Sequence, residues 1–374
     1  MRTLIFEPCL TGHHLEYLNH YYKGALERPE QEYIFLVPFS FENVRDKYEW
    51  KSAKNIRFEY FEDRELSKCI HTNKYVAGYN KAKLISKSSK LYGADRVLLT
   101  ILMEVIPFVL FFLPSGIKLR GIIYQIYLYT QSSDSKFRVL IDKFRYWLMA
   151  RCNKMEKVYI LNDEDSANKF NCIFKTNKFT FLPDPVPNVD MNFVKSIRSD
   201  LGLNKNDFVY FHFGGLAKRK GTLEILKAII DSKKESLNDC AFIFAGKVNK
   251  DIKDEFYSLL SDAREKARVL VYDEFCSYEF LYNLCYSIDC ILMPYKITKL
   301  SSGVLGYAAV FKKPVIGPSD GLIGNLIKRN GLGMCLSYVS KDYIKKEFGK
   351  RLQLVETKYV EKNDVSEFIR IILK

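Results

Sequence analysis

The sequence predicts an α/β fold built from two Rossmann-like domains. The chain has 374 residues, which suits two domains of roughly 150–200 residues each better than one ordinary core. In both halves, short apolar segments alternate with segments of helical periodicity, an order typical of a parallel sheet with helices on both faces. Three prolines stand within residues 183–187, and because proline cannot continue a strand ladder or a helix, they divide the two series.

The first half contains five predicted strands and one clear helix. The strands are expected at residues 4–6, 33–37, 96–101, 121–124 and 158–161. A helix should run from His14 to about Leu26, after a loop that includes Gly12 and His13. The apolar run 97–113 spans 17 residues and is interrupted by Glu104 and Pro107. A membrane span needs about 20 apolar residues, so a buried strand followed by a packed helix is expected here.

The second half repeats this alternation after a linker at residues 181–188. Strands are expected at residues 208–213, 241–245, 269–272, 290–293 and 314–316, and helices at 222–232, 253–267, 277–287, 303–311 and 364–373. We therefore expect an N-terminal acceptor-binding domain at 1–184, a C-terminal donor-binding domain at 185–352 and a C-terminal helical segment at 353–374. A cleft should separate the two domains, and the last helix should return to the first.

The composition narrows the partners and the compartment. With 58 Lys and Arg against 44 Asp and Glu, the net charge of +14 suits phosphate-rich partners such as nucleotide-sugars or anionic lipid. No finger, RRM or basic zipper pattern is present in the sequence, so nucleic acid is not an expected partner. The 9 cysteines form neither a CxxC pair nor a zinc quartet, which predicts reduced thiols, a cytoplasmic protein and no metal site.

Two segments of the second half are candidates for phosphate binding. In FHFGGLAKRKG, residues 211–221, a strand ends at Gly214 and Gly215, and Arg219 and Lys220 precede a helix. In KLSSGVLGYAAVFKKPVIG, residues 299–317, Ser301, Ser302 and Gly303 stand where a helix should begin. Free N–H groups at helix starts and charge-assisted bonds from cations both favour phosphate. Read singly, these segments are also compatible with a solvated basic turn and an ordinary serine-capped helix.

The order of these motifs resembles the donor-binding half of glycosyltransferase family four, over about residues 205–335. Between the two phosphate segments lie a strand that ends in Ala-Gly (residues 242–246), a Tyr-Asp-Glu-Phe segment and a strand that ends at Met293 and Pro294. The first half is similar to the family through EPCLTGHHLEYL, residues 7–18, and the proline linker. Some bacterial polysaccharide glycosyltransferases of this family share the GHHLEY and SSGVLGYA patterns.

The resemblance implies a GT-B fold and assigns roles to individual residues. The donor diphosphate should contact Arg219 and Lys220, near Gly214 and Gly215. The nucleotide base should contact Glu274, Phe275 and Cys276. The distal phosphate should contact the backbone at Ser302, Gly303 and Val304. On the acceptor side, Gly12 should form the glycine loop, beside the catalytic candidates His13, His14 and, in the linker, Asp184. Interpretations without a chemical role also remain open: the two histidines could simply begin a helix, and the aspartate could be a turn residue.

The sequence departs from the family at a pair of glutamates, eight positions apart, that normally contact the donor. Those positions fall on Lys299 and Tyr307, or on Thr298 and Gly306 if the frame is shifted by one. Ser301 and Ser302 are candidates to replace them, with Tyr307 close by. A different donor preference or an inactive family member would also explain the change.

The resemblance implies transfer of a sugar from a nucleoside-diphosphate sugar to a glycan or lipid-linked acceptor, with retention of configuration, in bacterial surface polysaccharide synthesis. The nucleotide-sugar is a co-substrate, and no cofactor or metal is expected. Two alternatives stay open at this point. One is a non-catalytic nucleotide-sugar-binding partner of another transferase, and the other is a sugar-nucleotide epimerase on the same fold, although paired acids and histidines for an epimerase are not evident.

A basic and aromatic segment in residues 136–157 suggests a further partner. It holds seven Lys or Arg and two acids. Its apolar residues share one helical stripe: Phe137, Leu140, Ile141, Phe144, Trp147 and Leu148. A helix lying on an anionic membrane has this pattern, which would place the protein at the inner face of the plasma membrane. A helix packed on its own sheet has the same pattern, so both interpretations are open.

Overall fold

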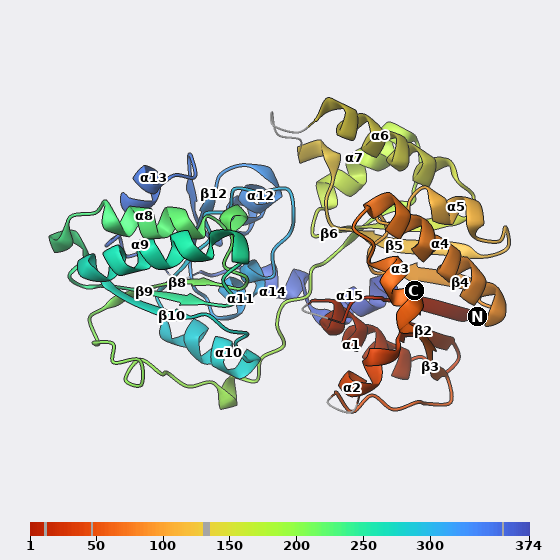
Figure 1. The fold of residues 1–374 in the computed structure, drawn as a ribbon, viewed down its shortest axis with the longest axis horizontal. Coiled ribbons are helices and arrows are strands. Elements are labelled where there is room, and N and C mark those ends of the chain that lie inside the picture. The colour runs from red at the N-terminus through yellow and green to blue at the C-terminus, as the bar shows by residue number, and fades with distance from the viewer. Residues whose placement is uncertain (11–12, 46–47, 130–134, 354) are drawn as a thin grey trace. The chain divides into compact units, whose positions relative to one another are not determined.

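The chain forms two compact units in the computed structural model, which describes residues 1–10, 13–45, 48–129, 135–353 and 355–374. Unit 1 comprises Met1–Pro183 together with Val365–Lys374, and unit 2 comprises Asp184–Asp364. Figure 1 shows that each unit is a sheet with helices on both faces. The two-domain α/β class expected from the sequence is therefore confirmed, including the return of the last helix to the first unit.

Unit 1 is built on a seven-stranded parallel sheet in the order β3-β2-β1-β4-β5-β6-β7. Its strands are β1 (Arg2–Phe6), β2 (Glu32–Pro38), β3 (Ile56–Phe61), β4 (Arg96–Leu99), β5 (Lys118–Ile123), β6 (Met155–Leu161) and β7 (Phe179–Leu182). Its longer helices are α1 (His13–Leu26), α4 (Lys74–Leu91), α6 (Lys136–Arg151) and α7 (Glu164–Phe174). The short helices α2 (Glu42–Arg45), α3 (Asp63–Cys69) and α5 (Phe108–Phe112) complete the unit with α15 (Val365–Ile372).

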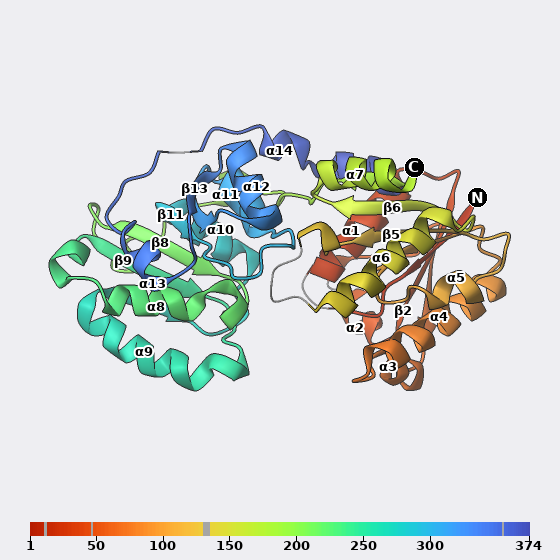
Figure 2. The same cartoon turned by 90° about the horizontal axis from the view of Figure 1, so that it is seen from above.

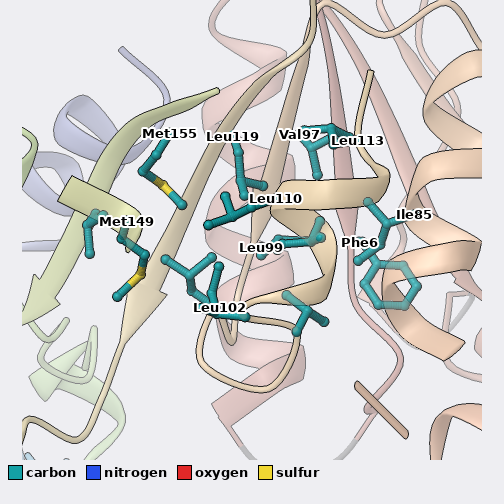
Figure 3. Close-up of a cluster of buried hydrophobic side chains, with 14 of the residues drawn as sticks. Phe6, Ile85, Val97, Leu99, Leu102, Leu110, Leu113, Leu119, Met149 and Met155 are labelled. Atoms are coloured by element: carbon teal, nitrogen blue, oxygen red, sulfur yellow. The ribbon is translucent and has the colours of Figure 1, made fainter. Parts of the chain in front are cut away.

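Each face of this sheet has its own hydrophobic core, because side chains along a strand alternate between faces. In β1, Leu4 and Phe6 belong to one core and Ile5 to the other. The first core, beneath helices α4, α5 and α6, is drawn in Figure 3, where Leu99 appears between Met149 and Phe6. Figure 1 shows α4, α5 and α6 on one side of the sheet and α1 with α15 on the other, where both contribute to the second core. Burial on both faces explains the continuous apolar segments of central strands such as β1 and β2.

The apolar run 97–113 forms β4 and the short helix α5, as predicted from its interruption by Glu104 and Pro107. Both elements contribute to the first core through Val97, Val109 and Leu110. Within the described ranges, none of the helices has the length and apolar character needed to cross a bilayer.

Helix α15 completes the second core of unit 1. The Phe368 ring is fully buried, with its centroid 5.2 Å from that of Tyr17 and 5.9 Å from that of Tyr21. The Tyr159 hydroxyl, on β6, donates to the carbonyl of Ile371 at 3.2 Å. The last helix is thus an integral part of unit 1 rather than an appendage.

Unit 2 is built on a six-stranded parallel sheet in the order β10-β9-β8-β11-β12-β13. Its strands are β8 (Phe208–Phe213), β9 (Cys240–Ala245), β10 (Arg268–Tyr272), β11 (Cys290–Leu292), β12 (Val315–Pro318) and β13 (Gly333–Leu336). The helices are α8 (Thr222–Ile230), α9 (Lys253–Lys266), α10 (Tyr278–Ser287), α11 (Val304–Val310), α12 (Gly321–Asn330), α13 (Lys341–Lys345) and α14 (Tyr359–Lys362). Its core gathers the apolar faces of α8 and α9 against β8 and β9.

We predict that Phe368→Ala lowers the free energy of unfolding of unit 1 by about 3–5 kcal/mol, because the substitution leaves a cavity where the ring fills the second core. Both tryptophans, Trp50 and Trp147, lie in unit 1, so denaturant unfolding followed by tryptophan fluorescence reports on this unit. Phe111→Ala is the control, since the Phe111 ring is 70% exposed. Equal stability of the two variants would contradict this role of α15.

Candidate functional site

Both sheets change their direction of growth beside their first strand. In unit 1, β1 lies between β2 and β4, and in unit 2, β8 lies between β9 and β11. In open parallel sheets, ligands bind beyond the carboxyl ends of the strands at such a point, because the loops there diverge to opposite faces. The segments that follow β1 and β4, and those that follow β8 and β11, are therefore the places to look for a site.

In unit 2, the loop after β8 encloses a buried ammonium group. Lys220 is buried, and its Nζ donates to the carbonyl of Phe213 at 3.3 Å and lies 5.3 Å from the centre of the Tyr295 ring. Gly214 has a φ of +83°, and a Cβ there would lie 2.6 Å from Lys220 Nζ. The glycine thus leaves room for the ammonium at the strand end. Arg219, by contrast, is exposed.

A buried histidine holds this loop in place. His212 Nδ1 donates to the carbonyl of Leu292 at 2.9 Å, and Nε2 lies 2.9 Å from the Thr222 hydroxyl oxygen. That hydroxyl also accepts from the amide of Ala217 at 3.1 Å. Burial lowers the pKa of His212 to about 3, so the ring is neutral near pH 7. His212 is therefore a structural residue that connects β8, β11 and the start of α8.

The base-binding segment predicted at residues 274–276 follows β10. Phe275 is 82% exposed, Glu274 is also exposed, and Cys276 is buried. Asp273 anchors the segment by accepting from the amide of Val248 at 2.8 Å and from the Tyr257 hydroxyl at 2.9 Å. Phe275 and Glu274 are accessible to a ligand, whereas Cys276 faces the protein.

The segment before α11 differs from the sequence-based expectation. Gly303 is the N-cap of α11, and no side chain caps the helix, so the predicted serine cap is wrong. Ser301 instead donates from its hydroxyl to Asp184 Oδ2 at 2.7 Å. The Asp184 amide donates to the buried side chain of Asn363 at 3.1 Å. Asp184 thereby brings a carboxylate to this segment.

Helix α11 connects this segment to the loop after β8. The Tyr307 ring lies 5.3 Å from that of Phe213, whose carbonyl accepts from Lys220. The other positions expected for the missing glutamates are occupied differently. Thr298 is buried and donates to Asp320 Oδ2 at 3.3 Å. A Cβ on Gly306 would lie 3.1 Å from Pro187, so a glutamate side chain there would need the linker to shift.

Unit 1 has a pocket of about 140 Å³ at its own switch point. It is lined by Phe6, Glu7, Pro8, Cys9, His14, Lys81, Leu99, Ile101, Glu104 and Val105. The Glu7 carboxyl is 1% exposed; it lies 2.9 Å from His14 Nδ1 through Oε2 and accepts from the Cys9 amide at 2.8 Å. Lys81 pairs with Glu104, and both residues line the pocket. The pocket therefore combines two acid–base pairs in a small space.

The pKa of His14 reflects competing effects. Burial lowers it, but hydrogen bonds to Cys9 and Glu7 and the Glu7 charge more than compensate and raise the pKa to about 10. His14 is then an imidazolium near pH 7, which donates hydrogen bonds and cannot accept a proton as a general base. This geometry suits a group that donates hydrogen bonds to a ligand better than a general base.

The remaining unit 1 candidates are His13 and Gly12. His13 is the first residue of α1, and its side chain, like Gly12 as a whole, lies outside the described residues. Sequence reasoning missed Glu7, Cys9, Lys81 and Glu104, which come from three separate parts of the chain. The sequence EPC before the glycine loop was the available signal for Glu7, since a carboxylate directly after a buried strand faces the ligand edge.

Metal chemistry receives no direct support from side-chain grouping. In the part of the chain that the structure describes, no three His, Cys, Asp or Glu side chains come together as a metal site. Metal-independent transfer stays a prediction.

Comparisons with known proteins bear on the fold. No model of a protein family matches the sequence, and no curated protein is similar to it. Solved structures, however, match along the whole chain. HepE of Anabaena, determined with UDP and glucose, aligns over 100% of this chain and 98% of its own, with 14% identity and a TM-score of 0.67. The chain has the GT-B fold.

Two further structures show the same architecture. WaaG, described as a glycosyltransferase involved in lipopolysaccharide biosynthesis, has 12% identity and a TM-score of 0.63, with coverage of 100% and 94%. An α,α-trehalose-phosphate synthase (UDP-forming) from Burkholderia vietnamiensis has 7% identity and a TM-score of 0.70, with coverage of 100% and 98%. At these identities the likeness establishes the fold and leaves the chemistry to the residues of this chain.

We predict that Glu7→Gln lowers the pKa of His14 by about 1–3 pH units, because the carboxylate charge stabilises the imidazolium. A pKa raised in the folded state stabilises the fold below pH 6.5, and this contribution is lost as the pH rises through about 10. NMR titration measures the pKa, with the resonance assigned by its loss in His14→Gln. Glu104→Gln, at the Lys81 pair, is the control. An unchanged pKa in Glu7→Gln would contradict the assignment.

Proposed function

We propose that this protein is a glycosyltransferase that transfers a sugar from a nucleoside-diphosphate sugar to a glycan or lipid-linked acceptor. The proposal includes bacterial surface polysaccharide synthesis as its setting and the inner face of the plasma membrane as its place of work. The GT-B fold and the residues at the two switch points support it, together with the motif order of residues 205–335.

The observation that carries the proposal is the position of Lys220. An ammonium buried at the carboxyl end of a central strand, beside a glycine loop, loses hydration and gains a neutral carbonyl and an aromatic ring in return, but no carboxylate among the described residues. A diphosphate at this loop would supply the missing anionic partner. Exposed Arg219 adjoins Lys220 and adds a second cation that can reach phosphate oxygens.

The chemistry assigned to this half of the donor site is stabilisation of the leaving group. As the sugar–phosphate bond breaks, negative charge accumulates on the nucleoside diphosphate, and fixed cations at Lys220 and Arg219 lower the energy of that state. No metal is needed for this role. The loop at Ser301, Ser302, Gly303 and Val304 is assigned to the distal phosphate and the sugar, with Asp184 positioning Ser301 through its hydrogen bond.

The acceptor is assigned to the unit 1 pocket. His14 as an imidazolium and Lys81 present hydrogen-bond donors, and Glu7 and Glu104 present acceptors, a combination that suits hydroxyl groups or a phosphate of a glycan or lipid-linked acceptor. Retention of configuration is part of the proposal by resemblance. It is checked by NMR of the anomeric proton of the product before mutarotation.

A non-catalytic nucleotide-sugar-binding partner is the second candidate, favoured by the replacement of both family glutamates. Turnover separates the two. Release of nucleoside diphosphate that depends on an acceptor extract supports the transferase, whereas tight donor binding with no release under any acceptor supports the partner.

We expect one nucleoside diphosphate to raise the melting temperature in a screen of UDP, GDP, ADP and TDP, with the monophosphate CMP in the same screen, with and without magnesium. Ligand at about 100 times its Kd adds about 2.7 kcal/mol of stability. Lys220→Ala and Arg219→Ala should each weaken binding by about 1.5–3 kcal/mol through loss of a charge-assisted contact. Lys218→Ala, an exposed neighbour in the same turn, is the matched control. Undiminished affinity in folded Lys220→Ala would overturn the site.

We also predict that Phe275→Ala weakens binding of that nucleotide by about 1–3 kcal/mol, the range measured for stacking of a base on an aromatic ring. Because the ring is 82% exposed, the substitution should leave the melting temperature of the free protein unchanged. Isothermal titration calorimetry measures the affinity, and Phe193→Ala, at another exposed ring of unit 2, serves as the control. Equal affinities of both variants would remove Phe275 from the base site.

A further inference from the structure

Helix α6 turns an apolar stripe towards solvent. Phe137, Leu140, Phe144 and Trp147 are between 47% and 72% exposed. Their spacing of three, four and three residues places them on one side of the helix. The Phe144 and Trp147 rings stack, with centroids 5.9 Å apart. These four residues, called here the α6 stripe, are the centre of the inference.

The stripe does not form part of the core of unit 1. Helix α6 packs on the sheet through a different side, where Tyr146, Met149 and Ala150 are buried. Ile141 and Leu148, which the sequence placed in the same stripe, are half-buried between the two sides. Packing on its own sheet, one of the two interpretations of this helix, therefore does not explain the exposed residues.

Exposed cations border the stripe. Lys136, Lys143 and Arg151 occupy the same side of α6 and are all exposed, and Arg138 is exposed at its first turn. Asp142 is the one acidic residue of α6, and it pairs with Arg145 at 3.3 Å. The border of the stripe is thus strongly positive.

Helix α4 continues this surface. The guanidinium of Arg145 lies 5.9 Å from the centre of the Tyr75 ring, which connects the two helices. Tyr75, Val76 and Tyr79 are exposed on α4, and the helix contains no acidic residue. Its exposed cations are Lys74, Lys83, Lys87 and Lys90, of which Lys87 lies 3.9 Å from Glu65 of α3. Figures 1 and 2 show both helices on the same side of the sheet of unit 1.

We propose that this surface of α4 and α6 docks on an anionic lipid bilayer, with the α6 stripe inserted at the level of the headgroups. A helix that lies in the interface has large apolar side chains on one side and lysine or arginine at its borders. Aromatic rings sit well at that depth, and anionic headgroups attract the bordering cations. The cations of the surface thus match the anionic headgroups of a bilayer, and its apolar centre matches the acyl chains beneath them.

A nucleic acid fits the surface less well. It would engage the cations and the rings, but Leu140 and Val76 offer neither a phosphate contact nor a stacking plane. The inference rests on the proposed membrane location and names the surface that would reach the membrane; it requires no donor site, so vesicle binding and nucleotide binding can fail independently.

The test is co-sedimentation of the full chain with vesicles of phosphatidylcholine alone and with about one third phosphatidylglycerol. We expect binding to the anionic vesicles only, weakened by salt. Trp147 provides a direct reading, because the other tryptophan, Trp50, is buried. Its fluorescence should shift to shorter wavelength with anionic vesicles and should be quenched by lipids brominated near the headgroup. Trp147→Phe should abolish both signals and retain sedimentation.

Paired variants separate the apolar and charged contributions. Phe144→Ser should weaken vesicle binding about tenfold, and Lys143→Glu at least about fivefold, the effect of one cation at an anionic surface. The controls are Phe193→Ser and Lys205→Glu, at exposed positions of unit 2, which should bind as the parent chain does. Circular dichroism and the melting temperature of the free protein confirm that each variant is folded.

Three results would overturn the proposal. The first is equal binding to neutral and anionic vesicles. The second is undiminished vesicle binding by folded Phe144→Ser. The third is a single-stranded oligonucleotide that displaces the protein from anionic vesicles, when vesicle binding itself causes no shift of the Trp147 fluorescence. Anionic-vesicle binding lost in the two α6 variants and kept in the two controls supports it.

Discussion

Each unit depends on one topological constraint: its parallel sheet grows outwards in both directions from its first strand. Because crossovers between parallel strands are right-handed as a rule, the connections on the two sides of β1, and of β8, carry the chain to opposite faces of the sheet. The loops that follow the central strands must therefore part, which leaves polar backbone and side chains at the carboxyl edge without a covering helix. Glu7 and the Gly214 loop occupy these positions in the two units. Their chemistry differs, but both lie at a switch point that has the same topological origin.

The two sites solve the burial of charge in different ways. In unit 1, His14 and Lys81 each face a carboxylate, so the pocket is nearly balanced in charge. In unit 2, Lys220 faces a carbonyl and an aromatic ring, which stabilise an ammonium only partly. In unit 2, the Lys220 ammonium therefore has no carboxylate partner among the described residues, and an anionic ligand could fill that place. This asymmetry is a physical reason to separate a phosphate-bearing substrate from a mainly hydroxyl-bearing one.

The sequence predicted most of what is governed by local pattern. Fully buried strands such as β8, FVYFHF, read clearly because every residue is apolar or aromatic around one histidine. Strand β3, IRFEYF, was missed because charged residues interrupt it near the edge of the sheet, and α4 was missed because serines and lysines dilute its apolar face. The serine cap expected before α11 does not form, because the N-cap is Gly303; the Ser301 hydroxyl instead donates to Asp184, 117 residues away. Lys81 and Glu104 could not be placed, because only the tertiary fold brings them to β1. Helix α6 showed periodicity, yet periodicity does not reveal which side meets the sheet.

The membership of α15 in unit 1 has a consequence for synthesis. Ribosomes add residues in order, so all of unit 2 is made between β7 and the helix that seals the second core of unit 1. Until α15 is made, the first unit lacks Phe368 and the acceptor of the Tyr159 hydrogen bond, so the aromatic surface at Tyr17 and Tyr21 stays exposed. Unit 2 is continuous in the chain and meets no such delay. Truncated or stalled chains should thus contain a folded second unit and a first unit with exposed aromatic surface. Chaperones bind exposed apolar surface of this kind, so their binding would depend on completion of the last helix.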